Sequence, residues 1–284
     1  MNSRLPVLVL TGSAMLWGLS WWPMQKLGAA GVAGPMLALL SYGGVGLLSL
    51  PLLWRERAFW RHRLGQMAAI ALFGGWAATS FLQAMSEGDV VREMLLFYLA
   101  PAWSVLGGRF LLKEHLSARR SFAIGAAMAG AFLVIQAGGT LGKATITVAD
   151  ALALSAGLSF AAGNLATRAA SEIPLASKTS AQLLGCALLS ILTIAVTGMP
   201  WQPMGASSIW GVAAFSLIWI AAGTTTTAYG MSKLEAGHSA LIILAELVTA
   251  VVSASAVNHR APSGLEVLGG ALILSAAAID GLEQ

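Results

Sequence analysis

A succession of long apolar runs constrains this chain more than any other feature. Ten such runs can be marked, at approximately residues 5–25, 35–54, 65–85, 94–112, 121–138, 149–168, 179–197, 208–230, 239–257 and 264–281. A helix needs about 20 apolar residues to cross a hydrocarbon core. Only 10% of the 284 residues are charged, whereas soluble domains carry about 25%. The sequence therefore predicts an all-α integral membrane protein with ten transmembrane helices.

The distribution of basic residues predicts the orientation in the membrane. With an even number of spans, both termini lie on the same side. Of the 16 Lys and Arg residues, the loops on the opposite side hold only Lys26, Arg92, Lys143 and Arg260. Cytoplasmic loops are enriched in Lys and Arg. We therefore expect a multi-pass protein of the cell inner (plasma) membrane with both termini in the cytoplasm.

The two halves of the chain resemble each other. The segment "AMLWGLSWW" at residues 14–22 is echoed by "ALSAGLSFA" at residues 153–161. Each half carries five predicted spans, and because five is odd the second half enters the membrane from the opposite side. Inverted repeats of this kind are typical of secondary transporters, which bind their solute near the bilayer midplane between the halves. We expect two units, residues 1–140 and 141–284, around a central cavity.

Several stretches are similar to a known family. The pattern "WGLSW" in the first span and "YLAPAWSVLGGRFLLKEHLSARRSFAIGAAMAGAFLVI" across spans four and five resemble EamA-type transporters of the drug/metabolite transporter superfamily. Within it, the chain resembles the aromatic amino acid exporters most. The resemblance implies a ten-helix bundle that moves small metabolites out of the cell and is not an enzyme. The second half departs from the family pattern, because Leu247 follows Glu246 where members often carry proline.

Glu246 is the one carboxylate within the apolar run "ALIILAELVTAVVSA". At 1.5 Å per residue it lies about 10 Å from the start of its run, too deep for a short side chain to reach the headgroups. Ionisable side chains at such a depth are costly and mark solute or proton paths. Glu246 is therefore a candidate to bind a solute ammonium group or to take up a proton. The alternative is a protonated side chain that hydrogen-bonds a neighbouring helix.

Aromatic and uncharged polar side chains complete the predicted substrate site. Trp17 and Trp21 are one turn apart on one face of the predicted first span, where they could stack on an aromatic solute. The other candidates lie in spans three, four and six, and they are Thr79, Gln83, Tyr98, Phe160 and Asn164. Pro101 is predicted to kink span four as a gating element. The alternative roles are hydrogen bonds between helices for the polar residues and an ordinary kink for Pro101.

Several apparent motifs carry no chemistry. The segment "AGGTLGKAT" lacks the first glycine of a phosphate loop and the Ser or Thr that should follow Lys143. The four histidines are far apart and lack metal-ligand spacing, so we expect no metal and no cofactor. The basic stretch "RERAFWRHR" fits the headgroups of anionic membrane lipid better than nucleic acid. The oligomeric state, monomer or homodimer, stays open.

Together these features predict a secondary transporter that exports small amphipathic metabolites, above all aromatic or apolar amino acids, by alternating access. Export of other small solutes or drugs is the first alternative. An integral-membrane enzyme acting on lipid-soluble substrates would need acids, His or Cys clustered near one membrane face. A scaffold or sensor would need no polar residues along a path through the bundle. The driving force stays open between the gradient of the solute itself and a proton taken up by Glu246.

Overall fold

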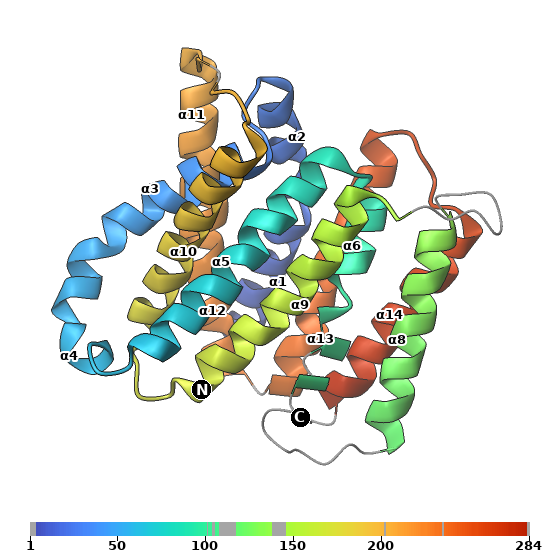
Figure 1. Cartoon of the computed structure of the whole chain (residues 1–284). Coiled ribbons are helices and arrows are strands. Elements are labelled where there is room, and N and C mark those ends of the chain that lie inside the picture. The colour runs from blue at the N-terminus through green and yellow to red at the C-terminus, as the bar shows by residue number, and fades with distance from the viewer. Residues whose placement is uncertain are drawn as a thin grey trace.

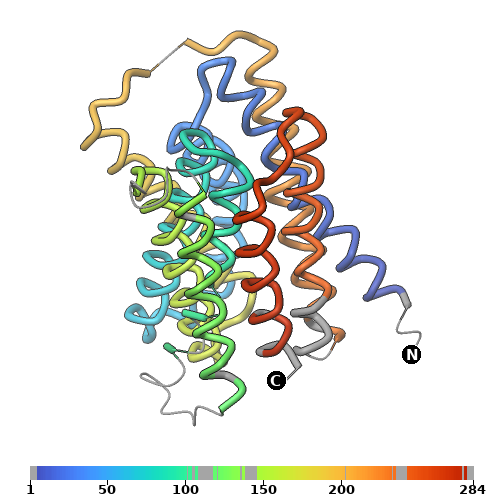
Figure 2. The backbone as a smooth tube through the Cα atoms, turned by 90° about the vertical axis from the view of Figure 1, so that its right-hand side faces the viewer, coloured from blue at the N-terminus to red at the C-terminus, as the bar shows by residue number. Residues whose placement is uncertain are grey.

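Helices form every regular element in the part of the chain that the computed structural model describes. This part comprises residues 4–100, 102–103, 106–107, 118–137, 146–201, 203–234 and 236–282. The helices pack side by side into one bundle (Figures 1 and 2). The start of the first helix and the end of the last lie at the same end of this bundle. We call it the terminal end and the other the far end.

The described helices have the following bounds. In chain order they are α1 (Arg4–Gly18), α2 (Trp21–Ala29), α3 (Gly34–Arg55), α4 (Arg57–Trp60), α5 (Leu64–Glu87), α6 (Val90–Phe97), α8 (Ala118–Ala137), α9 (Val148–Ala169), α10 (Leu175–Thr197), α11 (Ala206–Phe215), the π-helix η1 (Ser216–Gly223), α12 (Thr224–Lys233), α13 (Ala236–Val257) and α14 (Gly264–Leu282).

Among the described residues, six helical segments are long and apolar enough to cross a membrane, namely Leu5–Ala29, Gly34–Arg55, Leu64–Glu87, Val148–Ala169, Leu175–Thr197 and Ala206–Met231. Shorter apolar helices coincide with the fifth, ninth and tenth predicted runs, at Ser121–Val134, Ile242–Val257 and Gly264–Ala276. Much of the fourth predicted run lies outside the described residues. These helices indicate a multi-pass membrane protein, and the full count of ten spans stays a prediction.

Two of the six segments are interrupted near their middle. The sequence predicts one continuous helix through residues 5–25, but α1 ends at Gly18 and α2 begins at Trp21, with a turn between them. The segment at 206–231 passes from α11 through the π-helical η1 into α12. π-Helical segments and broken membrane helices are frequent at functional sites. The two interruptions therefore direct attention to the helices around them.

The packing of the bundle pairs helices from the two halves of the sequence. α5 packs on α9 and α10, α8 on α14, α3 on α10, and α1 on α12 and α13. Small residues allow the α8–α14 contact, because a Cβ atom on Gly130 would lie 2.6 Å from the carbonyl oxygen of Gly269. The glycine-rich stretches of the fifth and tenth runs therefore serve packing within the bundle.

Candidate functional site

Glu246 lies on α13 at the point where α1 ends. A Cβ atom on Gly18 would lie 2.5 Å from the carbonyl oxygen of Glu246 and 2.7 Å from the Cβ of Thr249, so only glycine allows this approach. The Glu246 side chain is half-buried. Within the described residues, no Lys or Arg forms an ion pair with it. Among the described residues, its carboxyl group therefore has none of the cations that ordinarily pair with a buried acid.

Two tyrosines from other parts of the bundle lie near this carboxyl group. Tyr98, just after α6, donates a hydrogen bond to the carbonyl oxygen of Ile243 at 3.5 Å and lies in hydrogen-bonding range of the Glu246 carboxyl group. Tyr42 on α3 is close enough to Glu246 to interact with it electrostatically. Tyr98 was predicted as a site residue, whereas Tyr42 was not. Its sequence neighbours "LLSYGGVG" carry no charge or repeat that could have marked it.

The two predicted tryptophans contact different parts of the bundle. Trp21 on α2 is 2% exposed, and its Nε1 donates to the hydroxyl of Ser253 on α13 at 2.9 Å. Trp17 on α1 is half-buried, and its ring lies 3.2 Å from the position of a Cβ atom on Gly223 in η1. Between them α1 ends and α2 begins, and their side chains contact different neighbours, η1 for Trp17 and α13 for Trp21. A shared solute-binding role of the two stays a prediction. Trp21 holds α2 against α13, and Trp17 is the more accessible of the two.

An aromatic cluster adjoins Tyr98. The ring of Phe97 lies 4.7 Å from that of Phe81, 5.6 Å from that of Phe160 and 5.8 Å from that of Tyr98. The cluster therefore joins α5, α6 and α9 next to the Glu246 region. The predicted residue Phe160 is 41% exposed, and Asn164, one turn further along α9, is exposed. Both are accessible, and the cluster connects Phe160 to Tyr98.

Thr79 and Gln83 make contacts that belong to helix packing. The Thr79 hydroxyl donates to the carbonyl oxygens of Gly75 at 3.0 Å and of Cys186 at 3.3 Å, which ties α5 to α10. The Gln83 amide donates to Glu87 on its own helix at 3.0 Å. These contacts fit the alternative role of hydrogen bonding within and between helices. Pro101 lies outside the described residues.

A group of hydroxyls joins α1 to the interrupted segment at 206–231. The Ser13 hydroxyl lies 2.7 Å from that of Thr227 and donates to the carbonyl oxygen of Gly223 at 3.2 Å. Trp219 of η1 donates through Nε1 to the carbonyl oxygen of Leu16 at 2.8 Å. The side chain of a π-helical residue thus bonds a carbonyl oxygen in the last turn of α1. These bonds hold η1 beside the break in the first span.

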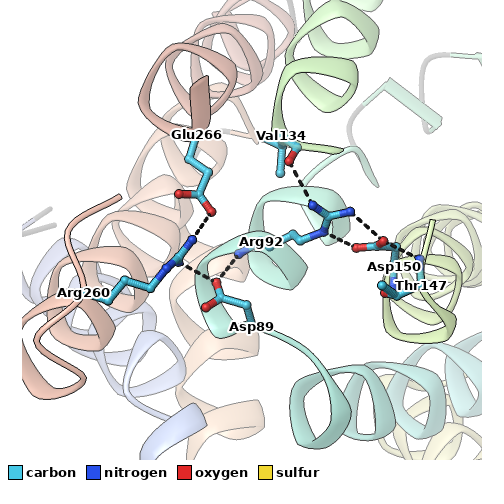
Figure 3. Close-up of polar contacts among 7 residues, drawn as sticks. All are labelled: Asp89, Arg92, Val134, Thr147, Asp150, Arg260 and Glu266. Atoms are coloured by element: carbon cyan, nitrogen blue, oxygen red, sulfur yellow. Dashed lines mark hydrogen bonds and ion pairs between the residues drawn. The ribbon is translucent and has the colours of Figure 1, made fainter. Parts of the chain in front are cut away.

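A second polar region lies at the far end of the bundle, and Figure 3 shows it as a chain of hydrogen bonds and ion pairs. Arg92 on α6 donates through Nε and Nη2 to the two carboxylate oxygens of Asp150 on α9, the second bond measuring 2.7 Å. Its Nη1 donates to the carbonyl oxygen of Val134 on α8 at 3.3 Å. The Arg92 and Asp150 side chains are 9% and 0% exposed. This buried pair connects the two halves of the sequence.

The chain of ion pairs continues through Arg260, in the connection between α13 and α14. Its guanidinium donates to Asp89 at 3.0 Å and to Glu266 at 2.8 Å. The hydrogen bond to Glu266 is the main cause that raises the pKa of Arg260 above its usual value. We call these five residues, Asp89, Arg92, Asp150, Arg260 and Glu266, the ionic network. Each of its three carboxylates accepts a hydrogen bond from a guanidinium.

The ionic network is built on the N-termini of three helices. Asp89 caps α6, and its Oδ1 accepts from the backbone N–H of Arg92 at 3.1 Å. Thr147 and Asp150 form a capping box on α9, and Ser263 and Glu266 exchange the same pair of bonds on α14. The pattern of Ser or Thr followed three residues later by an acid, in "TVAD" and "SGLE", is a sequence signal for such caps. From the sequence, Arg92 and Arg260 contributed only to the predicted membrane topology, and the ionic network was not predicted.

Glu93 lies beside this network, but one of its carboxyl oxygens differs from the carboxylates of the network in its hydrogen bonding. It follows Arg92 on α6 and is 1% exposed. Its Oε2 has no hydrogen-bond partner in the part of the chain that the structure describes. A buried charged oxygen without a donor is unfavourable, so a neutral side chain suits this position better.

Residues 4–136 match the EamA-like transporter family, so a domain of the drug/metabolite transporter superfamily is found in the first half of the chain. This confirms the family-level resemblance for those residues, while the likeness to aromatic amino acid exporters stays a prediction. No curated protein matches the chain.

A solved crystal structure shares the fold. It aligns with 99% of this chain and 97% of its own with a TM-score of 0.63 and 21% sequence identity. At this level of identity the likeness concerns the fold alone. Together, the apolar helices and the family match indicate a multi-pass membrane transporter of small solutes.

Proposed function

We propose that the chain is a secondary transporter that exports small amphipathic metabolites, with aromatic and apolar amino acids as its solutes. The observation that carries this proposal is the Glu246 carboxyl group, which lies within the bundle without a Lys or Arg partner among the described residues. An amino acid brings its own ammonium group, which supplies the missing cation.

The neighbours of Glu246 suit the rest of such a solute. The hydroxyl of Tyr98 lies beside the carboxyl group, and Trp17 is half-buried on the helix that ends against Glu246. The cluster around Phe97 offers aromatic faces on the other side of Tyr98. Apolar walls with a few polar groups are the usual lining of small-molecule sites. An aromatic side chain would stack there with ring centroids about 4.5–7 Å apart.

Alternating access in this proposal moves two inverted five-helix units, residues 1–140 and 141–284, against each other. The packing of the helices supports such units. If a two-fold axis relates the halves, each contact between helices should recur between their counterparts in the other half. The contact of α5 with α9 has its counterpart in that of α12 with α1, and the contact of α6 with α9 has its counterpart in that of α13 with α1. The family match ends at residue 136, near the proposed boundary.

In this proposal the ionic network closes the far end of the bundle. Arg92 comes from the first unit, and Asp150 comes from the second, so their bond holds the two units together at the far end. The excess of Lys and Arg in the loops of the terminal end supports a cytoplasmic location for that end, in the inner (plasma) membrane. The far end then faces outward, and export requires the bond between Arg92 and Asp150 to open.

Counterflow in proteoliposomes tests the proposed function. Vesicles loaded with unlabelled tryptophan, phenylalanine, leucine or glutamate should accumulate the matching labelled amino acid for the first three and not for glutamate. A pH gradient imposed on wild type and on Glu246→Gln separates the solute's own gradient from a proton gradient as the driving force. If Glu246 carries a proton, the pH gradient changes transport by wild type but not by Glu246→Gln. Equal transport by the two proteins, with and without the gradient, would remove the proton role.

The outcomes also separate the alternative solutes. Counterflow of none of these amino acids, together with counterflow of cationic dyes or other drugs, would favour a drug exporter of the same superfamily. Absence of counterflow for every solute in a correctly folded protein would contradict the proposal.

A further inference from the structure

An apolar groove runs along the edge of the bundle near its terminal end. It has a volume of about 570 Å³, and its lining residues are Leu47, Leu50, Pro51, Leu53, Trp54 and Trp60. All of these belong to the last turns of α3 and to α4, which lie at the left edge of the bundle in Figure 1. Leu47 is 63% exposed and Trp54 is 68% exposed. The groove is thus an apolar surface that the described helices leave open.

The walls of the groove are fixed by contacts within the bundle. The Nε1 of Trp60 donates to the carbonyl oxygen of Leu53 at 3.0 Å. Both residues pack against a buried cluster made by Met67, Ile70, Ala170, Ile173 and Ala181. Pro51 lies inside α3, and because proline has no N–H, the carbonyl group of Leu47 loses its helical donor. The groove is therefore preformed and has one carbonyl acceptor in its wall.

Three exposed arginines lie in the segment that carries the groove-lining residues Trp54 and Trp60. Arg57 lies over the ring of Trp54, 4.9 Å from the ring centre, and donates to the carbonyl oxygen of the same residue at 3.3 Å. Arg55 and Arg61 lie in the same connection between α3 and α5, and all three side chains are exposed. Within the described residues, no carboxylate forms an ion pair with any of the three.

Glu56, which lies between Arg55 and Arg57 in the sequence, does not neutralise these arginines. Glu56 turns into the protein, where its Oε2 accepts from the backbone N–H of Ser177 at 3.1 Å and from the hydroxyl of the same residue at 2.5 Å. This carboxylate thus serves the first turn of α10. Arg63 lies 3.8 Å from Glu172, whose side chain is 73% exposed, and such a surface pair contributes little. The open end of the groove therefore keeps a net positive charge.

We propose that this groove and its arginines bind one anionic phospholipid, with an acyl chain against Leu47, Leu50 and Trp54 and the phosphate at Arg57 and Arg61. An apolar groove that ends at tryptophans and then at arginines matches the order of chain, interface and headgroup in a lipid leaflet. The charge selects an anionic headgroup over a zwitterionic one. This site is independent of the solute and needs only that the protein spans a membrane.

Native mass spectrometry of the purified protein tests this site. Phosphatidylglycerol and phosphatidylcholine with identical acyl chains are added in equal amounts, and the bound lipid is measured. Wild type should retain one phosphatidylglycerol in preference to phosphatidylcholine. The double variant Arg57→Gln and Arg61→Gln should lower this preference by about fivefold for each arginine removed. Lys233→Gln, an exposed lysine at the end of α12, is the matched control and should change nothing.

A second variant tests the groove independently of charge. Leu50→Trp fills the groove from a position that is 42% exposed, so it should preserve folding and lower the retention of both lipids. Equal retention of the two lipids by wild type would overturn the proposal. So would an unchanged preference in the double arginine variant, or full retention by Leu50→Trp. Transport assays do not enter these readouts, so a failure here leaves the proposed function unaffected.

Discussion

The ionic network and the Glu246 region both place charge inside the bundle, but they differ in how that charge is balanced. In the network each carboxylate accepts from a guanidinium and also from a backbone N–H at a helix N-terminus. Glu246 has tyrosine neighbours and no cation among the described residues. Removing one partner from a balanced buried cluster is strongly destabilising, whereas an acid without a described cation can take one from a ligand. The comparison therefore assigns closure of the far end to the ionic network and solute binding to α13.

The largest difference between the two regions should appear in stability. Arg92→Leu leaves the buried Asp150 carboxylate without its guanidinium, which should cost about 3–5 kcal/mol of unfolding free energy. Glu246→Gln removes a charge that has no ion-pair partner among the described residues and should lower stability by less than about 1 kcal/mol. Thermal unfolding of both variants in detergent measures this. A larger loss for Glu246→Gln than for Arg92→Leu would reverse the assignment.

A smaller effect should follow from disturbing the approach of α1 to α13. A Cβ atom on Gly18 would lie 2.5 Å from the carbonyl oxygen of Glu246, so Gly18→Ala must separate the two helices. Overpacking of this kind costs about 1–3 kcal/mol, and transport should fall with it. Gly12→Ala on the same helix is the control, because no atom lies within 4 Å of its added Cβ. Equal transport by the two variants would mean that the helix contact at Glu246 has no functional role.

The two tryptophans should respond differently to the same substitution. Trp21→Phe loses the hydrogen bond to Ser253 and should cost about 1 kcal/mol of stability. Trp17→Phe keeps an aromatic ring at a half-buried position and should leave stability unchanged while weakening the apparent affinity for an aromatic solute. Unfolding and counterflow measured on both variants separate these effects. A shift in affinity for Trp21→Phe alone would exchange their roles.

The smallest effect is expected at Glu93, the buried acid that the ionic network does not satisfy. Glu93→Gln removes a charge from an oxygen without a described partner, so the unfolding midpoint should stay the same or rise slightly. Asp150→Asn, which weakens a satisfied carboxylate of the network, should lower it. If Glu93→Gln destabilised the protein as much as Asp150→Asn, Glu93 would be an equal member of the network.

The sequence predicted the apolar helices because hydrophobic run length depends on local composition alone. It also marked Glu246 as a candidate, since an acid inside an apolar run is visible without knowledge of any contact. The roles of Glu246 and Tyr98 in binding a solute stay predictions. The break after Gly18 was not predicted, because the segment "WGLSWW" is as apolar as the rest of its span. The need for glycine at position 18 becomes visible only from the close contact with α13.

The ionic network was missed for a related reason. Its residues stand at the starts of three helices, at positions 89–92, 147–150 and 260–266, and each segment alone looks like an ordinary polar loop. Helix packing brings them together, and single-sequence patterns do not contain that information. Local cap signals were present at Thr147 and Ser263. They could have located the helix starts more precisely, but they could not have predicted the ion pairs.

The decisive test of Glu246 as the ammonium-binding group is the equilibrium affinity of the purified protein for tryptophan and for indole-3-propionate, which lacks the amino group. Wild type should bind tryptophan more tightly, because only tryptophan offers a cation to the unpaired carboxylate. In Glu246→Gln the two affinities should converge, while Glu87→Gln, an exposed acid on α5, should behave as wild type. A preference for tryptophan that survives in Glu246→Gln would contradict the role assigned to this residue.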